Sequence, residues 1–371
     1  MKIPNGHEVI QLFEQFSPKG LAMEGDKIGL QIGRLNKKVE RIMIALDVLE
    51  NVVDEAVEKN VQLIIAHHPI IYRPLKNLLT DSAQGKIIEK LLKHDIAVYA
   101  AHTNLDVAVG GVNDLLAEAL ELKDTEVLVP TVDTKLKKLV VFVPASHAEE
   151  IRNVLGKAGA GSIGNYSHCS FSGNGTGRFL PEDNTNPFIG EAGKLEEVDE
   201  VRLETIVPEP VLKKTITAML KAHPYEEVAY DVYPLENKGE VLGLGRIGKV
   251  PETTLGEFTE KVKKALEVSH VRVVGDLSAK VKKVAVLGGD GNKYFMNAKY
   301  QGADVYVTGD IYYHTAHDAL MQGLNMIDPG HNVEKVMKKG LTATLQRMCK
   351  NAGFSVEIFP SAENTDPFQF L

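Results

Sequence analysis

Short apolar runs alternate with longer amphipathic runs along most of this chain. The first third predicts three strands, at 41–48, 61–68 and 96–103, with helices near 50–59, 84–94 and 112–120. Parallel strands need a crossover connection, usually a helix, so this alternation predicts βαβ units in a parallel sheet. The pattern returns late, with strands expected at 283–289, 303–310, 324–330 and 355–359. Both ends of the chain therefore indicate an α/β core.

The middle of the chain has a different order. Strands are expected at 138–144, 196–208 and 228–235, helices at 146–158 and 209–222, and a Gly/Ser/Asn-rich stretch at 159–194. This β–α–β–β–α–β-like order favours a ferredoxin-like α+β domain inserted into the core. The expected domains are a discontinuous core, 1–130 with 238–371, and an insert at 131–237. Within the insert, residues 173–177 are expected to form a flexible loop.

Composition excludes several classes of protein. The 371 residues suggest two or three domains, and 44% hydrophobic with 25% charged residues is ordinary for a globular protein. A net charge of -8 argues against nucleic acid as a partner. The first residues carry no apolar signal-peptide core, and no apolar run approaches a membrane span. With only Cys169 and Cys349, no disulfide framework is expected, which indicates a reduced, cytoplasmic protein.

Histidines and carboxylates gather at the ends of the predicted strands. The candidates at three strand ends are His67, His68, His102, Asp106, His331 and Glu334. In open α/β sheets, functional sites lie beyond the carboxyl ends of the strands, so these three ends can meet at one crevice. A lone histidine after a strand is more often an ordinary structural residue. Several candidate ligands at three strand ends favour a metal site instead.

The spacing and chemistry of these residues fit divalent ions. Imidazole with carboxylate suits zinc, the first candidate, and also iron or manganese. If a helix begins there, His331 and Glu334 lie three positions apart on one face. Adjacent strand residues point to opposite sides, so His67 and His68 can both reach the site only if the chain turns at Pro69. Asp106 carries two oxygens and is interpreted as a bridge between two ions.

Two further histidines have open roles. His102 and His317 lie near the ligand segments, and each is a candidate second-layer partner of a ligand or a general acid. Each can equally be a structural histidine. His314 is expected to take no part.

Two glycine-rich motifs are weaker signals. GLGRIG at 243–248 matches a dinucleotide-binding pattern, but the following Lys-Val-Pro does not begin a helix, so no nucleotide is expected there. GGDGN at 288–292 follows a strand and is either a backbone nest for an anion or a plain glycine turn.

Several segments of the core carry a family resemblance: EGDKIGLQIG (24–33), LIIAHHPIIY (63–72), AAHTNLDVAVGGVND (100–114), VTGDIYYHTAHDA (307–319) and DPGHNVEK (328–335). They resemble the Nif-three-like family, whose members are often named GTP cyclohydrolase I type 2 homologues. In the middle, GNYSHCSFSGNGTGRF (164–179) and AHPYEEVAYDVYPL (222–235) resemble the PII-like or CutA-like insert of the longer bacterial members.

The resemblance implies a core of two α/β lobes and a dinuclear metal site. The family's ligands are two adjacent histidines, an aspartate and a late histidine–glutamate pair, which match His67, His68, Asp106, His331 and Glu334. In shorter members the glutamate follows the histidine by four residues rather than three. The resemblance also implies a toroidal homohexamer.

Two classes of function remain open at this point. The first is a metal-dependent hydrolase, in which two divalent ions against two carboxylates leave positive charge for an anionic, nucleotide-like small molecule. The family name favours attack on a purine ring and names GTP. The second is a non-catalytic metal-binding or regulatory protein, with the insert as sensor or partner module. Nothing in the sequence indicates recognition of a guanine ring.

Overall fold

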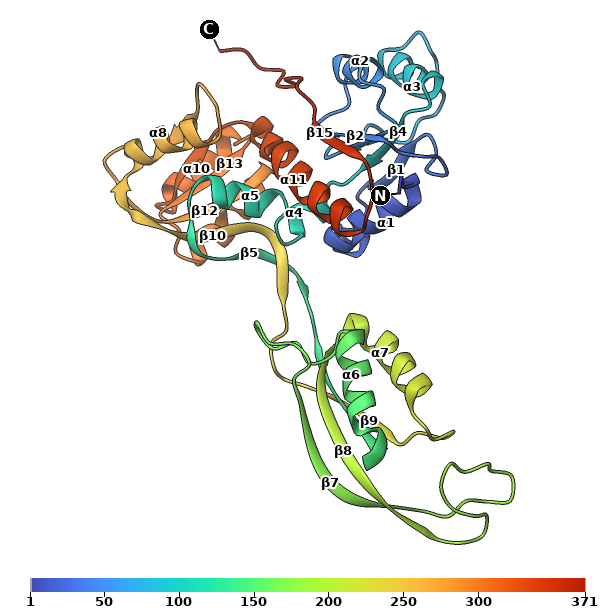
Figure 1. Cartoon of the computed structure of the whole chain (residues 1–371). Coiled ribbons are helices and arrows are strands. Elements are labelled where there is room, and N and C mark those ends of the chain that lie inside the picture. Colours follow the sequence, from blue (N-terminus) through green and yellow to red (C-terminus); the bar gives the residue numbers. More distant parts are fainter. Residues whose placement is uncertain (1, 371) are drawn as a thin grey trace. The chain divides into compact units, whose positions relative to one another are not determined.

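The computed structural model describes residues 2–370 and shows a mixed α/β fold with three sheets (Figure 1). Contacts divide the chain into two compact units. One comprises the chain up to Val132 together with the chain from Leu242 onward, and the other is Asp133–Val241. The first is called the core and the second the insert. Within residues 2–370, no helix is long and apolar enough to cross a membrane.

The first core sheet has the strand order β1-β4-β3-β2-β15. Its strands are β1 (Gly29–Ile32), β2 (Arg41–Ala45), β3 (Leu63–Ala66), β4 (Ala97–Ala100) and β15 (Glu357–Pro360). Strands β15, β2, β3 and β4 pair in parallel, as the strand–helix alternation predicts, and β1 adds an antiparallel edge. The helices that accompany this sheet are α1 (Gly6–Phe16), η1 (Lys19–Leu21), α2 (Glu50–Glu58), α3 (Ala83–Lys93), α4 (Thr103–Val107) and α5 (Val112–Ala119).

The second core sheet has the order β11-β14-β13-β12-β10-β5. Its strands are β5 (Lys123–Asp133), β10 (Val241–Thr254), β11 (Arg272–Val274), β12 (Lys280–Asp290), β13 (Val305–Gly309) and β14 (Asn325–Asp328). Strands β12, β13 and β14 pair in parallel, β10 pairs antiparallel to β12, and β11 pairs antiparallel to β14. The accompanying helices are α8 (Leu255–Ala265), η3 (Asn292–Tyr294), α9 (Phe295–Tyr300), α10 (Tyr313–Met321), η4 (His331–Lys335) and α11 (Val336–Asn351).

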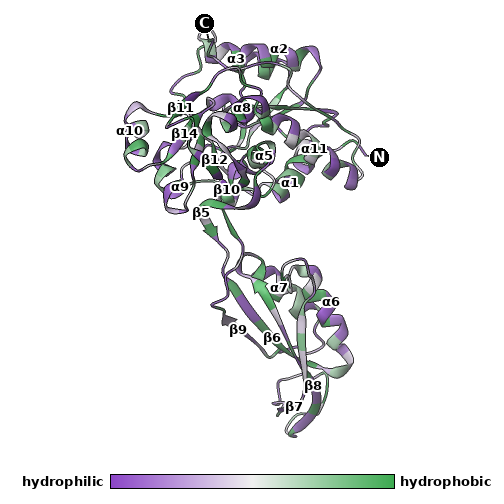
Figure 2. Cartoon of the chain, turned by 90° about the vertical axis from the view of Figure 1, so that its left-hand side faces the viewer, coloured by the Kyte–Doolittle hydropathy of each residue, from purple (hydrophilic) through white to green (hydrophobic). Residues whose placement is uncertain are grey.

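One hydrophobic cluster joins the two core sheets. It contains Ile42 and Ile65 from the first sheet, Val284 and Val305 from the second, and Leu345 from α11. All five side chains are essentially inaccessible to solvent. The helices of the core carry hydrophobic and hydrophilic residues side by side (Figure 2), as amphipathic helices do when one face packs against a sheet. The shared cluster fixes the carboxyl ends of the two sheets relative to one another.

The insert is a four-stranded antiparallel sheet with two helices. Its elements are β6 (Leu136–Pro144), η2 (Ala145–His147), α6 (Ala148–Ala158), β7 (Ser170–Phe179), β8 (Glu196–Pro208), α7 (Glu209–Ala222) and β9 (Tyr230–Pro234). The sheet order is β7-β8-β6-β9. The insert has a separate hydrophobic cluster, which includes Leu139, Ile151, Leu203 and Met219.

The expectation of a flexible loop at residues 173–177 is wrong. These residues lie inside β7, where Gly173 pairs with Arg202 and Gly177 with Val198. Glycine has a poor intrinsic preference for strands, and that preference misled the prediction. The backbone ladder to the long strand β8 decides the structure, because pairing depends on the peptide groups rather than on the side chains. The motif GLGRIG lies within a strand, β10.

We predict that the core folds and binds metal without the insert. Where the chain leaves and re-enters the core, β5 and β10 run side by side, and Thr131 Oγ1 lies 3.5 Å from the carbonyl oxygen of Leu242. A short Asn-Gly linker from Val132 to Leu242 should therefore close a hairpin. Circular dichroism and metal analysis of this variant provide the test. A shortened chain that aggregates or loses its metal would show that the insert is needed for the core.

Candidate metal centre

Strand β3 delivers two histidines to the carboxyl edge of the first sheet. The strand ends at Ala66, so His67 and His68 lie just beyond it rather than inside it. Their backbone N–H groups donate to the carbonyl oxygens of Ala45 and Leu46, at 3.1 Å and 2.9 Å. Outside the regular pleat the two rings come to lie 5.0 Å apart between centroids. The chain bends at His67 and His68 themselves, rather than at Pro69 as the sequence interpretation required.

The segment after β4 brings Asp106 to the same place. His102 precedes the short helix α4, and Asp106 lies within that helix. The carboxylate of Asp106 is almost fully buried, and its Oδ1 lies 3.6 Å from Nε2 of His67. The ring of His102 lies 5.2 Å from that of His67 between centroids.

The second sheet supplies the remaining two residues. Strand β14 ends at Asp328, and the 3-10 helix η4 begins at His331. His331 and Glu334 face one another across one turn of η4, with Nε2 of His331 3.2 Å from Oε2 of Glu334. Gly330 precedes them with a φ of 85°, a left-handed conformation that favours glycine.

Glu334 occupies the centre of the cluster. Its Oε2 lies 3.1 Å from Nε2 of His68, 3.2 Å from that of His331 and 3.7 Å from that of His67. Three groups of potential metal ligands have their donor atoms within 4.8 Å of one another: His67, Asp106 and Glu334; His68, His331 and Glu334; and His67, His68 and His102. Glu334 belongs to two of these groups and Asp106 to one. Glu334, rather than Asp106, is therefore the carboxylate common to two of the potential ligand groups.

Two polar atoms of the cluster are buried without a hydrogen-bond partner. They are Nε2 of His67 and Oδ1 of Asp106, which face each other. Two other such atoms among the described residues, Nζ of Lys37 and Oδ1 of Asn104, lie outside the cluster. A buried polar group without a partner costs roughly 1–3 kcal/mol, so native proteins rarely leave one. At 3.6 Å these two atoms are too far apart for a good hydrogen bond and close enough to ligate one cation.

A second layer of carboxylates orients the rings, and the sequence interpretation missed it. Asp47 Oδ1 lies 2.6 Å from Nδ1 of His68, and Asp310 Oδ2 lies 2.7 Å from Nδ1 of His331. Asp26 contacts Nδ1 of His102 in the same way, at 2.8 Å. Such partners fix the ring so that Nε2 faces the metal. The signal was available for Asp47 and Asp310, since each follows a parallel strand at the same edge as the ligands.

His67 is held differently. Its Nδ1 lies 2.9 Å from the carbonyl oxygen of Ala101, and the ring is completely buried. The backbone of the segment after β4 therefore orients the ring that no carboxylate reaches. Nothing in the sequence pattern distinguishes a histidine held by a carbonyl from one held by an aspartate.

The cluster binds protons tightly when no metal is present. Burial lowers the pKa of His68, but hydrogen bonds to Asp47 and Glu334 outweigh it and raise the value to about 10. The hydrogen bond to Glu334 raises the pKa of His331 to about 9. Burial raises the pKa of Asp106 to about 6, whereas the surrounding imidazoles keep that of Glu334 well below its usual range.

Metal binding is therefore expected to release protons. His68 and His331 have pKa values of about 10 and about 9, so both are protonated at pH 7.5, and an imidazole must lose its Nε2 proton to ligate a cation. Calorimetric titrations in buffers of different ionisation enthalpy should give different apparent enthalpies of binding. Their slope should correspond to two or more protons per chain, since burial lowers the pKa of His67 but Asp106 and Glu334 outweigh it and raise that pKa as well. An enthalpy that is the same in every buffer would show that neither ring ligates.

The structure separates the two histidines with open roles. His102 lies in the cluster, in one group with His67 and His68, and so is placed as a potential ligand. His317 lies on α10 with an exposed side chain, edge-on to Tyr313 at 4.6 Å between centroids, and belongs to none of the three groups. A catalytic role for His317 stays a prediction that this arrangement does not support.

The glycines of GGDGN lie against Glu334. A Cβ atom at Gly289 would come within 2.8 Å of Oε1 of Glu334, and one at Gly288 within 2.9 Å of the same atom. Gly289 also has a φ of 64°. The motif therefore makes room for the central carboxylate, which explains why glycine stands at both positions.

A cavity of about 700 Å³ opens beside the cluster. His68, His331, Asp47 and Asp310 reach its wall, together with Lys335. The chain end contributes Asn364 to Phe368 to the same wall. The volume lies within the range of small-molecule sites, so a ligand of nucleotide size can approach the histidines from this side.

Comparison with known proteins finds relatives along the whole chain. The profile of the Duf34/NIF3 (NGG1p interacting factor 3) family matches residues 4–367. Two relatives named GTP cyclohydrolase 1 type 2 homolog, from Bacillus subtilis and Halalkalibacterium halodurans, are 62% and 59% identical, and each match covers all of both chains.

Solved structures show the same fold. A Bacillus cereus protein related to NIF3 is 63% identical with a TM-score of 0.94, and the match covers all of both chains. A Staphylococcus aureus protein is 32% identical with a TM-score of 0.80, again over both full chains. The profile match over nearly the whole sequence and these full-length relatives lead to one conclusion: this chain belongs to the DUF34/NIF3 family.

Proposed function

We propose that the cluster holds two divalent metal ions and that the protein is a metal-dependent hydrolase of nucleotide-like anions. The observation that carries the proposal is the pair of buried atoms without partners, Nε2 of His67 and Oδ1 of Asp106. One ion would take His67, Asp106 and Glu334, and the other His68, His331 and Glu334. His102 would be a further ligand, since it groups with His67 of the first set and His68 of the second.

The donor set supports zinc first and iron or manganese next. Four imidazoles with two carboxylates are borderline ligands, which suit these ions better than the all-oxygen sets preferred by calcium or magnesium. Two divalent ions against Asp106 and Glu334 leave positive charge on the ions, of which Asp47 and Asp310 at the wall of the cavity offset a part. That charge favours an anionic substrate, and the names of the relatives point to a nucleotide.

The chain's own groups would prepare the site for hydrolysis. Bound divalent ions supply Lewis-acid activation of water near neutral pH and offset negative charge on the substrate. Asp47 and Asp310 hold the rings of His68 and His331 at the wall of the cavity, so the donor atoms are oriented before a ligand arrives. Asp106, which is buried and does not line the cavity, would set the charge of the inner position.

A turnover assay on a panel of nucleotides tests the function. Metal-loaded protein should hydrolyse at least one nucleotide, and a His67→Ala/His68→Ala variant should lose both metal and turnover. His317→Ala is the matched control, because that histidine is exposed and outside the cluster. Retained metal with no turnover of any nucleotide would reject the hydrolase and favour the regulatory alternative, with the insert as sensor or partner module.

The fold of the insert and the assembly form part of the same proposal. The order of elements in the insert and its strand order agree with a ferredoxin-like domain of the PII or CutA kind. Tyr166, Phe171 and Leu195 of the insert are more than 60% exposed, as expected for a surface that meets another copy. A homohexamer is the proposed state, and light scattering of the purified protein would measure it.

A further inference from the structure

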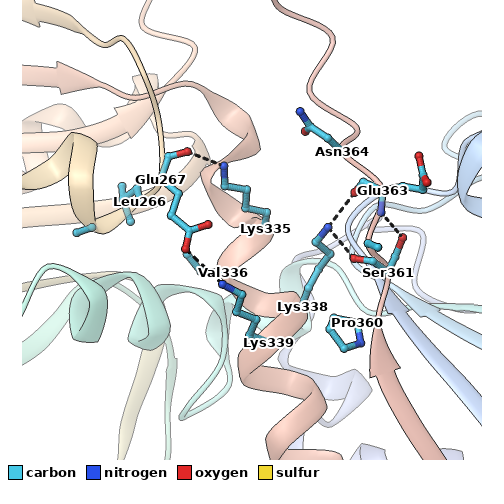
Figure 3. A pocket seen from close by; sticks show the side chains of 12 residues that line it. Leu266, Glu267, Lys335, Val336, Lys338, Lys339, Pro360, Ser361, Glu363 and Asn364 are labelled. Carbon is cyan, nitrogen blue, oxygen red and sulfur yellow. Dashed lines mark hydrogen bonds and ion pairs between the residues drawn. The ribbon is translucent and has the colours of Figure 1, made fainter.

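A second cavity, of about 560 Å³, adjoins the one at the metal cluster. Glu267, Lys335 and Asn364 line both. Three lysines that follow Glu334 along the chain reach into the second cavity: Lys335, Lys338 and Lys339 (Figure 3). We call it the lysine cavity. Because η4 carries His331 and Glu334 at the cluster and ends at Lys335, one turn of chain connects the two cavities.

The ammonium groups in the lysine cavity have donors to spare. Lys335 donates to the backbone oxygen of Glu267 at 3.0 Å, and Lys339 lies 3.3 Å from its carboxylate. Lys338 donates to the backbone oxygens of Ser361 and Glu363, at 3.1 Å and 3.0 Å. An ammonium group carries three N–H donors, so at least one donor on each lysine remains for a ligand.

The charges of the lysine cavity are not balanced. Three lysines face two acidic residues, and the carboxylate of Glu363 is turned to Asn51, at 2.7 Å. Within residues 2–370, no carboxylate lies within ion-pair distance of Lys338. Burial lowers the pKa of Lys338, and a nearby anion would favour its charged form again. This positive site stands out in a chain with a net charge of -8.

We propose that the lysine cavity binds the phosphate chain of a substrate whose reacting end lies at the metal cluster. This inference rests on the proposed function and names the class of its substrate, a phosphorylated compound with two or more linked phosphates. Phosphate oxygens accept several N–H donors at once, and lysine is a common partner of phosphate. The shared wall at Lys335 lets one extended molecule occupy both cavities.

A substitution at Glu267 should change the affinity for phosphate in the direction opposite to the loss of the lysines. Its carboxylate contacts Lys339 and would compete with a bound phosphate for that ammonium group. Its backbone oxygen, which holds Lys335, is unaffected by substitution. Glu267→Gln should therefore tighten the binding of a phosphate chain, whereas loss of the lysines should weaken it.

The test is calorimetric titration of metal-depleted full-length protein with inorganic tripolyphosphate. The Lys335→Gln/Lys339→Gln variant should bind at least about tenfold more weakly than the parent, and Glu267→Gln should bind more tightly. Lys350→Gln, an exposed lysine of α11 away from the cavity, should match the parent. Lys338 is left in place because it also holds the chain end.

The outcomes separate this inference from the proposed function. Equal affinity of the parent and the lysine variant would overturn the lysine cavity as a phosphate site, and so would binding that requires metal. Either result leaves the metal centre intact. Conversely, protein that binds no metal but shows the expected order of tripolyphosphate affinities would retain the phosphate site and reject the hydrolase. A titration with a nucleoside, which lacks phosphates, should show no difference between the parent and the lysine variant.

Discussion

Glu334→Gln is expected to weaken both metal sites by at least about 100-fold, since changes to groups that only support a ligand already cost roughly 10–100-fold. The carboxylate lies within 3.1–3.7 Å of Nε2 in three histidines and belongs to both three-residue ligand groups that contain a carboxylate. Glutamine preserves the shape of the side chain but removes its charge and one strong ligand oxygen. Each ion would lose a carboxylate oxygen as a ligand. The negative charge that offsets the repulsion between the two dications would be lost as well. Calorimetric metal titration measures the two affinities.

Asp106→Asn is the matched comparison. Asp106 belongs only to the group with His67 and Glu334, so its loss should weaken one ion strongly and leave the other near its parent affinity. If instead Asp106→Asn weakens both sites equally and Glu334→Gln weakens only one, Asp106 bridges and the assignment made from the distances is reversed. The sequence interpretation gave that reversed assignment, and the pair of variants decides between them.

Removal of the metal is expected to lower the melting temperature of the core by roughly 7 °C. A ligand present at about 1,000 times its dissociation constant stabilises the native state by about 4 kcal/mol, and each kcal/mol corresponds to somewhat under ~2 °C in a unit as large as the core. The ligands come from both core sheets, His67, His68 and Asp106 from the first and His331 and Glu334 from the second. Without metal, the buried atoms of His67 and Asp106 stay unpaired.

Differential scanning calorimetry with and without a chelator, at one scan rate, makes this measurement. The His67→Ala/His68→Ala variant is the control, because a protein that cannot hold the metal should melt at the same temperature in both conditions. A chelator effect of equal size in that variant would mean that the stabilising ion lies elsewhere. An unchanged melting temperature of the parent in the presence of the chelator would mean that the cluster binds no metal that stabilises the fold.

Much of the core could be predicted from the sequence because its signals are local. Apolar runs such as 61–68 and 303–310 alternate with amphipathic helices, and this pattern predicts parallel pairs and their common carboxyl edge. Strand ends were less certain, since β3 stops at Ala66 and leaves both histidines outside it. In the insert, the glycines of β7 gave no strand signal, and only the partner strand β8 makes the segment extended.

The candidate site was predictable as a set of residues and less so as an arrangement. His67, His68, Asp106, His331 and Glu334 come together as expected from their strand ends. Their relative positions depend on how the two sheets pack through the shared core, which no local pattern encodes. For that reason the central place of Glu334, a ligand position for His102 and the support from Asp26 emerged only from the structure. Asp47 and Asp310 were missed, although each follows a parallel strand at the same edge.

Anomalous X-ray scattering at the absorption edge of the metal, on crystals of protein whose metal content has been measured, tests the central claim most directly. Two ions per chain are predicted. One anomalous peak should lie among His67, Asp106 and Glu334 and the other among His68, His331 and Glu334. A chain that contains no divalent ion after reconstitution, or peaks that lie away from these residues, would contradict the account.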